Sequence, residues 1–192
     1  RIEDYHIKTL IDLKAKKATM EVQVFGADAR LMLLDPDGNI VCTGAVTKNK
    51  KISFEVKNPK LWSAEEPVLY DLLIETDSEI IGEKAGFRCI TSENGVIKFN
   101  GKPLKIRGVN RHDSYPDTGY YADREKMLHD LTLMKRSNIN AVRTSHYPQS
   151  QHFIRRCDEL GLLVFTEMPG WHYIGDQAWK EQAFVNLEEM IV

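Results

Sequence analysis

Three polar segments of this 192-residue sequence carry most of the side chains that could do chemistry. Each follows a short apolar run, and the three span residues 110–113, 143–147 and 167–172. Together they supply cations, imidazoles, carboxylates and an indole ring. Such a set can hydrogen-bond the hydroxyls of a ligand while an aromatic ring stacks on its apolar face. A sugar fits that description, and we expect these segments to bind one.

Each candidate residue also has a structural interpretation. Arg143 can close an ion pair inside the fold, and His112 or His146 can be satisfied by backbone carbonyls. Asp113 and Glu167 would be the two carboxylates of a glycosidase if both were catalytic. Asp113 is also explained as the cap of the following loop, and Glu167 as an anchor for an arginine or a histidine. We favour these supporting roles for the two carboxylates.

Other catalytic and metal-binding motifs are missing from the sequence. It contains no GxSxG elbow, no GxGxxG loop and no P-loop, so acyl-transfer and nucleotide-binding functions lack their usual signals. Cys42, Cys89 and Cys157 do not have the spacing of a zinc site. We interpret them as reduced thiols, which favours a cytoplasmic location.

The composition is that of a soluble, folded chain. It is 42% hydrophobic and 28% charged, which excludes a disordered chain and predicts a packed core. Lys and Arg number 26 against 28 Asp and Glu, and the net charge of -2 gives no support to a nucleic-acid or membrane partner. The apolar runs fall far short of the roughly 18 residues that a membrane helix needs.

Alternating strands and helices in the second half must position the three polar segments. Three β-type runs precede the polar segments, at residues 104–109, 139–142 and 162–166. Between them, 124–137 and 153–160 have apolar residues at helical spacing, with Asp123 as an N-cap and Gly161 as a stop signal. This order predicts a parallel sheet, whose carboxyl edge carries the polar segments. Three strands are too few to complete such a sheet, so the half is either an unusually small α/β unit or part of a larger barrel, and we favour the barrel.

A last helix is predicted at residues 179–192. Its apolar face consists of Ala183, Phe184, Leu187, Met190 and Ile191. The helix reaches the end of the sequence without a cap, and the sequence begins with Arg1. We therefore expect the chain to be a piece of a longer protein.

Short strands with turns between them are predicted in the first half. Residues 20–24, 52–56 and 68–76 alternate apolar and polar side chains, and residues 35–39, Asp-Pro-Asp-Gly-Asn, have the composition of a turn. No helical period interrupts this pattern, which is typical of a small antiparallel sandwich. We expect no catalytic residue in this half.

Residues 140–148 read Asn-Ala-Val-Arg-Thr-Ser-His-Tyr-Pro, and a predicted helix and strand follow them. These residues resemble the first signature of glycoside hydrolase family 2, and the resemblance extends along nearly the whole chain. Residues 100–113 resemble the start of the family's barrel, in a form more typical of its β-galactosidases than of its β-glucuronidases. Residues 59–70 and 86–88 resemble the end of its immunoglobulin-like sandwich.

The resemblance implies a multidomain fold of α and β elements. An immunoglobulin-like β-sandwich domain is expected at residues 1–89. The N-terminal part of a (β/α)8 TIM barrel, truncated after about three βα units, is expected at residues 90–192.

The resemblance also implies a function, that of a fragment of a retaining β-galactosidase. Such enzymes use one glutamate as acid/base and another as nucleophile, with about 5 Å between their carboxyl groups. Both are expected beyond this chain, which should be inactive alone. Six residues are expected to bind the β-galactoside: His112, Arg143, His146, Asn110, Glu167 and Trp171. By the resemblance the two histidines contact sugar hydroxyls and the arginine orients active-site carboxylates.

No cofactor or metal site is expected in this chain. Some β-galactosidases of the family bind Mg²⁺ through a Glu and a His, two residues apart, shortly after the third strand. Read without a gap, those positions here are Trp171 and Tyr173. His172 alone would be a poor ligand set for this oxygen-preferring cation.

Alternatives remain open. The chain could bind sugar without hydrolysing it, be a β-glucuronidase-type relative, or be an assembly fragment that self-associates through open strand edges. Ile106, Val142 and Val164 are expected to face the barrel interior without cover, so the barrel half should be looser than the sandwich or self-associated.

Overall fold

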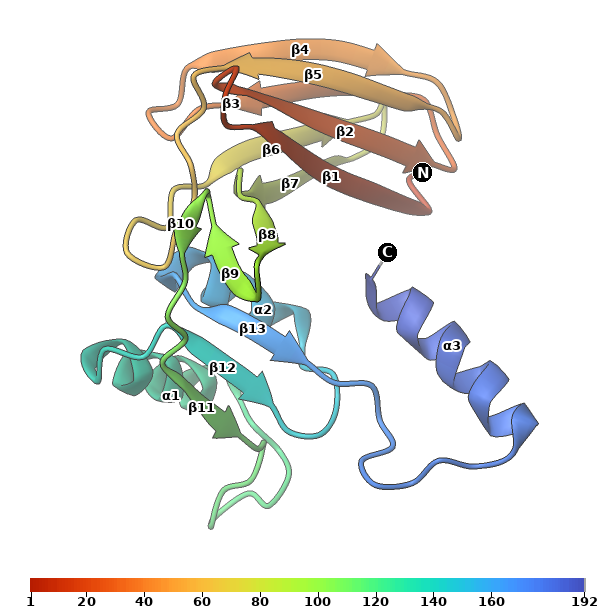
Figure 1. Cartoon of the computed structure of the whole chain (residues 1–192). Coiled ribbons are helices and arrows are strands. Elements are labelled where there is room, and N and C mark those ends of the chain that lie inside the picture. Colours follow the sequence, from red (N-terminus) through yellow and green to blue (C-terminus); the bar gives the residue numbers. More distant parts are fainter. Residues whose placement is uncertain (192) are drawn as a thin grey trace. The chain divides into compact units, whose positions relative to one another are not determined.

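Two compact units, Arg1–Lys105 and Ile106–Val192, make up the chain in the computed structural model (Figure 1). The structure describes residues 1–191, so Val192 lies outside the described residues. The strands of the first unit are β1 (Asp4–Asp12), β2 (Lys17–Phe25), β3 (Ala29–Leu34), β4 (Ile40–Val46), β5 (Lys51–Lys57), β6 (Tyr70–Glu75), β7 (Ile80–Ala85), β8 (Ile90–Glu93), β9 (Val96–Phe99) and β10 (Lys102–Pro103).

Two antiparallel sheets form the predicted sandwich. One has the strand order β1-β2-β5 and the other β4-β3-β6-β7. Every second residue of β2 is buried, and Tyr70, Leu72 and Ile74 of β6 are buried as the alternation predicts. Their side chains share one core with those of β3 and β5. The predicted turn at residues 35–39 joins β3 to β4.

A small third sheet, β10-β9-β8, follows the sandwich. Its hairpin turn places Asn94 and Gly95 at φ values of 51° and 76°. Positive φ at both central residues is what a tight two-residue hairpin requires, and Asn-Gly is the usual pair there. The division predicted at residue 89 precedes this sheet, whereas the first compact unit includes it. The domain boundary stays a prediction.

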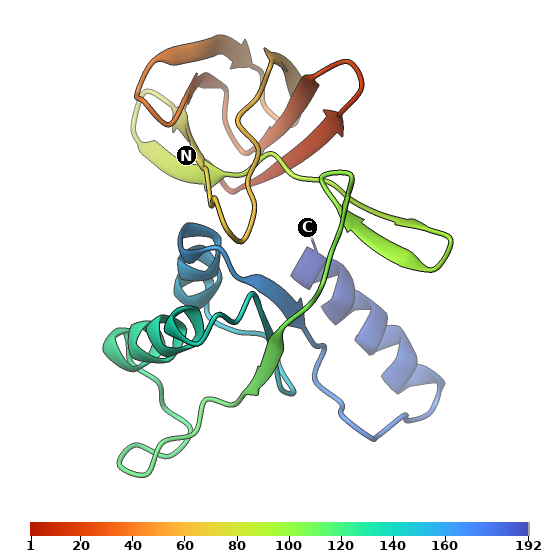
Figure 2. The ribbon, with the colours of Figure 1, turned by 60° about the vertical axis from the view of Figure 1, so that its left-hand side comes forward.

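The second unit has the predicted order of parallel strands and helices. Its elements are β11 (Gly108–Arg111), α1 (Arg124–Arg136), β12 (Ala141–Thr144), α2 (Gln151–Leu160), β13 (Leu163–Thr166) and α3 (Gln177–Ile191). The strands lie in the order β11-β12-β13, and α1 and α2 lie side by side (Figure 2). Asp123 caps α1 by accepting from the Lys126 N–H, and Gly161 ends α2 at φ 77°.

The parallel register corrects one prediction about the barrel interior. Val109, Val142 and Val164 are partners across the sheet, and Val142 and Val164 pack into the core formed with α1 and α2. Val142 is fully buried, so these two valines do not face an uncovered interior. On the opposite face the register aligns Asn110, Arg143 and Phe165. The interior face of this sheet therefore carries Asn110 and Arg143 at its carboxyl end, next to the apolar Phe165.

Strand and helix ends differ slightly from the predictions. The first strand begins at Gly108 because Leu104 bonds back to the third sheet, through its N–H to the Ile97 carbonyl. The last helix begins earlier than predicted, at Gln177, and the Trp179 ring packs edge-on against Tyr173. The side chain of Ile191, predicted on its apolar face, lies outside the described residues. In the described part of the chain, no helix is long and apolar enough to cross a membrane.

Thiol reactivity provides a test of whether the barrel half is loose. Cys157 of α2 is 1% exposed, and burial raises the pKa of its thiol to about 12. A protonated, buried thiol is a poor nucleophile, so iodoacetamide at pH 8 should label Cys157 far more slowly than the half-buried Cys89. Peptide mass spectrometry would measure both rates, with the urea-unfolded chain as the control. Equal rates in the native protein would mean that α2 opens freely.

Candidate functional site

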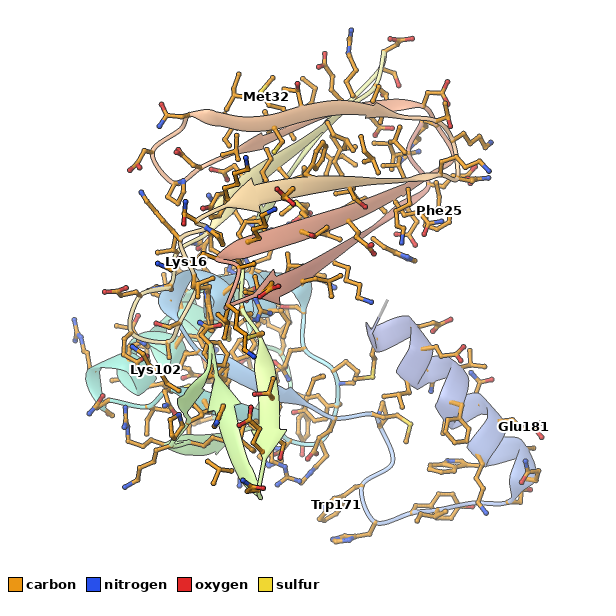
Figure 3. The ribbon with its side chains drawn as sticks, turned by 45° about the horizontal axis from the view of Figure 1, so that its top comes forward. Lys16, Phe25, Met32, Lys102, Trp171 and Glu181 are labelled. Atoms are coloured by element: carbon orange, nitrogen blue, oxygen red, sulfur yellow. The ribbon has the colours of Figure 1, made fainter. Side chains whose placement is uncertain are left out.

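The candidate site lies at the carboxyl edge of the parallel sheet. The last paired residues of the three strands are Arg111, Thr144 and Thr166, and the polar segments continue directly from them. Side chains after neighbouring parallel strands converge at such an edge. Figure 3 shows Trp171 in the segment between β13 and α3.

Arg143, His146 and Glu167 form one hydrogen-bonded group, which we call the charged triad. Arg143 Nε donates to Glu167 Oε1, and His146 Nδ1 lies 2.8 Å from Glu167 Oε2. A carboxylate can only accept, so His146 donates to it from Nδ1. The neutral form of this tautomer leaves Nε2 as an acceptor for a ligand hydroxyl. The anchoring role considered for Glu167 agrees with these contacts.

The environment of Glu167 keeps it ionised. The Arg143 guanidinium, and to a smaller extent His146, hold the pKa of the Glu167 carboxyl below its usual range, against the opposing effect of burial. A carboxylate that is ionised and bound by two donors cannot supply a proton at neutral pH. Glu167 therefore suits positioning and hydrogen bonding rather than general-acid chemistry.

Aromatic rings extend the site on both sides of the charged triad. The Trp171 ring stacks on His146, with centroids 5.0 Å apart and planes 20° from parallel. His112 meets His146 edge to face, with centroids 5.4 Å apart. Trp171 is 70% exposed and has a φ of 46°, a backbone conformation that side-chain-bearing residues seldom adopt. An exposed indole beside two imidazoles offers a stacking surface for a sugar ring.

Of the six predicted site residues, five are linked by these contacts. Asn110 is exposed and is the register partner of Arg143, on the same face of the sheet. The contacts establish proximity, and the roles assigned to the six residues stay predictions.

Comparison with known proteins identifies the family. A family model for "Glycosyl hydrolases family 2, TIM barrel domain" matches residues 90–186, and one for "Glycosyl hydrolases family 2" matches residues 1–88. The chain belongs to glycoside hydrolase family 2. The predicted family and the predicted fold class, a β-sandwich followed by part of a TIM barrel, are confirmed.

The curated relatives within family 2 are β-galactosidases. The chain is 47% identical to that of Thermoanaerobacterium thermosulfurigenes over 141 residues, which cover 71% of this chain and 20% of the relative. It is 38% identical to that of Staphylococcus xylosus over 171 residues, which cover 87% of this chain and 17% of the relative. The chain thus spans about a fifth of the length of these relatives.

Solved structures of β-glucuronidases share the fold. That of Parabacteroides merdae superposes with a TM-score of 0.87 at 28% identity and covers 100% of this chain and 26% of that one. That of Bacteroides uniformis β-glucuronidase 3 has a TM-score of 0.86 at 29% identity and covers 99% of this chain and 26% of that one.

Two residues beside this family 2 site, Tyr147 and Arg111, were not among the predicted site residues. The Tyr147 hydroxyl accepts the backbone N–H of Asp113, and Arg111 pairs with the Asp113 carboxylate. Arg111 had a signal in the sequence: it follows Asn110 on a strand, so one of the two must face the helices. A charged residue on that face requires buried partners. Asp113 is thus an ion-pair partner of Arg111.

The positions aligned with the family's Mg²⁺ ligands do not suit that ion. Trp171 and Tyr173 carry an indole and a phenol, whereas Mg²⁺ prefers carboxylate and water oxygens. Among residues 1–191, no three His, Cys, Asp or Glu side chains are grouped as metal ligands.

Titration of Glu167 would test the charged triad. A carboxyl group whose pKa is lower in the folded than in the unfolded chain stabilises the folded state at pH values above the unfolded pKa of about 4.3. That contribution disappears as the pH falls through the lower folded value. We therefore expect the ¹³C signal of the Glu167 carboxyl to titrate below the usual range of glutamates, and Arg143→Met to move the midpoint upward. A midpoint that Arg143→Met leaves in place would contradict the ion pair.

Proposed function

We propose that this chain is the part of a retaining family 2 β-galactosidase that binds the sugar at the carboxyl edge of the barrel strands. We also propose that it does not hydrolyse β-galactosides by itself. The observation that carries the proposal is the charged triad of Arg143, His146 and Glu167, with Trp171 stacked on His146.

The chemistry of a sugar matches this group. Hydroxyls both donate and accept hydrogen bonds, and the charged triad presents a carboxylate acceptor, a guanidinium donor and an imidazole whose partner fixes its tautomer. The Trp171 ring can cover the apolar C–H face of a pyranose. Since Arg143, His146 and Glu167 are already bound to one another, little side-chain freedom is lost when a sugar binds.

The carboxylates in this site are poorly suited to hydrolysis. A retaining reaction needs one carboxylic acid to protonate the leaving oxygen and one carboxylate to attack carbon. Glu167 is held ionised by Arg143, and Asp113 is paired with the Arg111 guanidinium. We therefore propose that the acid/base and nucleophile glutamates come from other parts of the enzyme.

The identity of the sugar is the point on which the relatives differ. The curated relatives are named β-galactosidases, and the structural neighbours are β-glucuronidases. The higher sequence identity favours the galactoside.

Calorimetry with galactose and glucuronate, together with hydrolysis of a chromogenic β-galactoside, tests this proposal. We expect weak galactose binding, weaker glucuronate binding and no turnover. Trp171→Ala should weaken galactose binding, whereas Tyr173→Ala is the matched control because Tyr173 packs on Trp179 instead. Turnover that disappears in Glu167→Gln or Asp113→Asn would place the catalytic pair within this chain and overturn the proposed division of roles.

We further propose that the isolated chain self-associates through its parallel sheet. Strands β11 and β13 are the sheet edges among the described residues, and Val109 and Phe165 on them are 37% and 52% exposed. Unpaired edges favour pairing with a second copy. Analytical ultracentrifugation should show a dimer whose fraction rises with concentration. A monomer at every concentration would rule this out.

A further inference from the structure

Arg111 at the end of β11 is buried on the helix-facing side of the sheet. Its side chain is only 4% exposed. The guanidinium carbon lies 4.6 Å from the centroid of the Phe153 ring in α2. Asn110, one residue earlier, lies on the opposite face beside Arg143, as strand alternation requires. A charge buried this deeply is stable only when several partners bind it.

Four side chains from three segments, α1 and the loops after β11 and β12, bind the Arg111 guanidinium. Nε donates to Asp130 Oδ2 of α1, and Nη2 donates to Tyr115 Oη. Nη1 donates to Gln149 Oε1, and each of these three hydrogen bonds measures 2.9 Å. Nη1 also donates to Asp113 Oδ1, in the loop after β11. Tyr115 in turn donates to Asp130, which closes the network. Gln149 belongs to the loop after β12, so Arg111 binds both loops at once.

Two further hydrogen bonds join the loops on either side of the histidine pair. The Ser145 N–H donates to the Arg111 carbonyl at 3.0 Å. The Asp113 N–H donates to the Tyr147 hydroxyl at 2.9 Å. His112 therefore lies between Arg111 and Asp113, and His146 lies between their partners Ser145 and Tyr147. The ring contact between the histidines depends on the relative position of the two loops.

We propose that Arg111 is a positioning residue, which holds the loops after β11 and β12 together so that His112 and His146 face one bound sugar. The identity of the ligand rests on the proposed function, but the geometry of the loops does not. Lysine cannot take over this role. Its ammonium group is a point charge with three donors, whereas the planar guanidinium reaches four acceptors in fixed directions.

The test compares Arg111→Lys with Arg156→Lys in the whole chain. Arg156 pairs with Glu159 within α2 and binds neither loop, so it is a matched control. Circular dichroism would report folding, a nuclear Overhauser effect between the His112 and His146 rings would report loop position, and calorimetry would report galactose affinity. We expect Arg111→Lys to fold, to lose the ring-to-ring signal and to bind galactose about tenfold more weakly, the loss of one charge-assisted hydrogen bond. Arg156→Lys should match the wild type.

Each remaining outcome also decides the question. A folded Arg111→Lys variant with the wild-type ring signal and affinity would overturn the proposal. If this variant does not fold, Tyr115→Phe and Gln149→Leu each remove one partner, and each should weaken the ring signal and lower affinity by about two- to fivefold. Wild-type values in both variants would also overturn it. A wild-type chain that binds no galactose would refute the sugar function alone, because the ring signal still tests Arg111.

Discussion

Replacing Glu167 by glutamine is expected to weaken galactose binding by about 10- to 100-fold, the cost of losing charge-assisted hydrogen bonds. The carboxylate accepts from both Arg143 and His146, with two oxygens. A glutamine side chain has one oxygen and one NH₂ group, so it can accept from only one of them. If it accepts from Arg143, its NH₂ faces His146 Nδ1, which must then become an acceptor. The ring would present a donor to the sugar where it had presented an acceptor.

Calorimetry would measure this loss, with Glu159→Gln as the control. Glu159 accepts from Arg156 on α2, so the control removes a carboxylate of the same kind away from the candidate site. We expect Glu159→Gln to bind galactose like the wild type. The role of Glu167 as the acceptor that orders the site would be wrong if both variants retained wild-type affinity.

Leu131→Ala is expected to destabilise the second unit by about 2–5 kcal/mol, the usual cost of this change in a packed core. Leu131 of α1 is fully buried against a small set of neighbours from β12, α2 and β13. The sandwich has a much larger core of its own. Since the free energy of unfolding of a domain is only about 5–15 kcal/mol, this loss is a large part of the stability of the second unit. The sandwich should be unaffected.

Hydrogen exchange measured by mass spectrometry would separate the two units. Amides of α1 and α2 should exchange faster in Leu131→Ala, while those of β2 and β6 keep their protection. Leu128→Ala is the control, because Leu128 lies on the same helix and is 44% exposed. Leu72→Ala in β6 should give the reverse pattern. Uniform loss of protection in both units after Leu131→Ala would mean that they unfold together.

Periodicity predicted the sandwich well because its strands have one face toward the core and one face accessible to solvent. Tyr70, Leu72 and Ile74 alternate with residues that are only half buried, so their side of the sheet could be assigned from the sequence. Asp123 and Gly161 marked helix ends in the sequence, because the Asp123 carboxylate accepts from the Lys126 N–H and Gly161 adopts the left-handed conformation after α2.

The short parallel strands were harder to orient. In β12 apolar residues occupy both faces, so the sequence did not tell which of Ala141 and Val142 meets the helices. Only the register with β11 and β13 decides this. The sequence analysis found the polar strand ends, because chain order brings parallel strand ends to one edge. The sequence did not predict the Arg111 network, whose residues come from four segments: β11, α1 and the loops after β11 and β12.

The charged triad has a consequence for synthesis of the chain. Arg143 lies on β12, and Glu167, 24 residues later, directly follows the neighbouring strand β13. The ion pair can therefore form on a nascent chain as soon as Glu167 leaves the ribosome, since N-terminal segments fold first during translation. Pairing of this guanidinium therefore needs no segment after Glu167 to have folded.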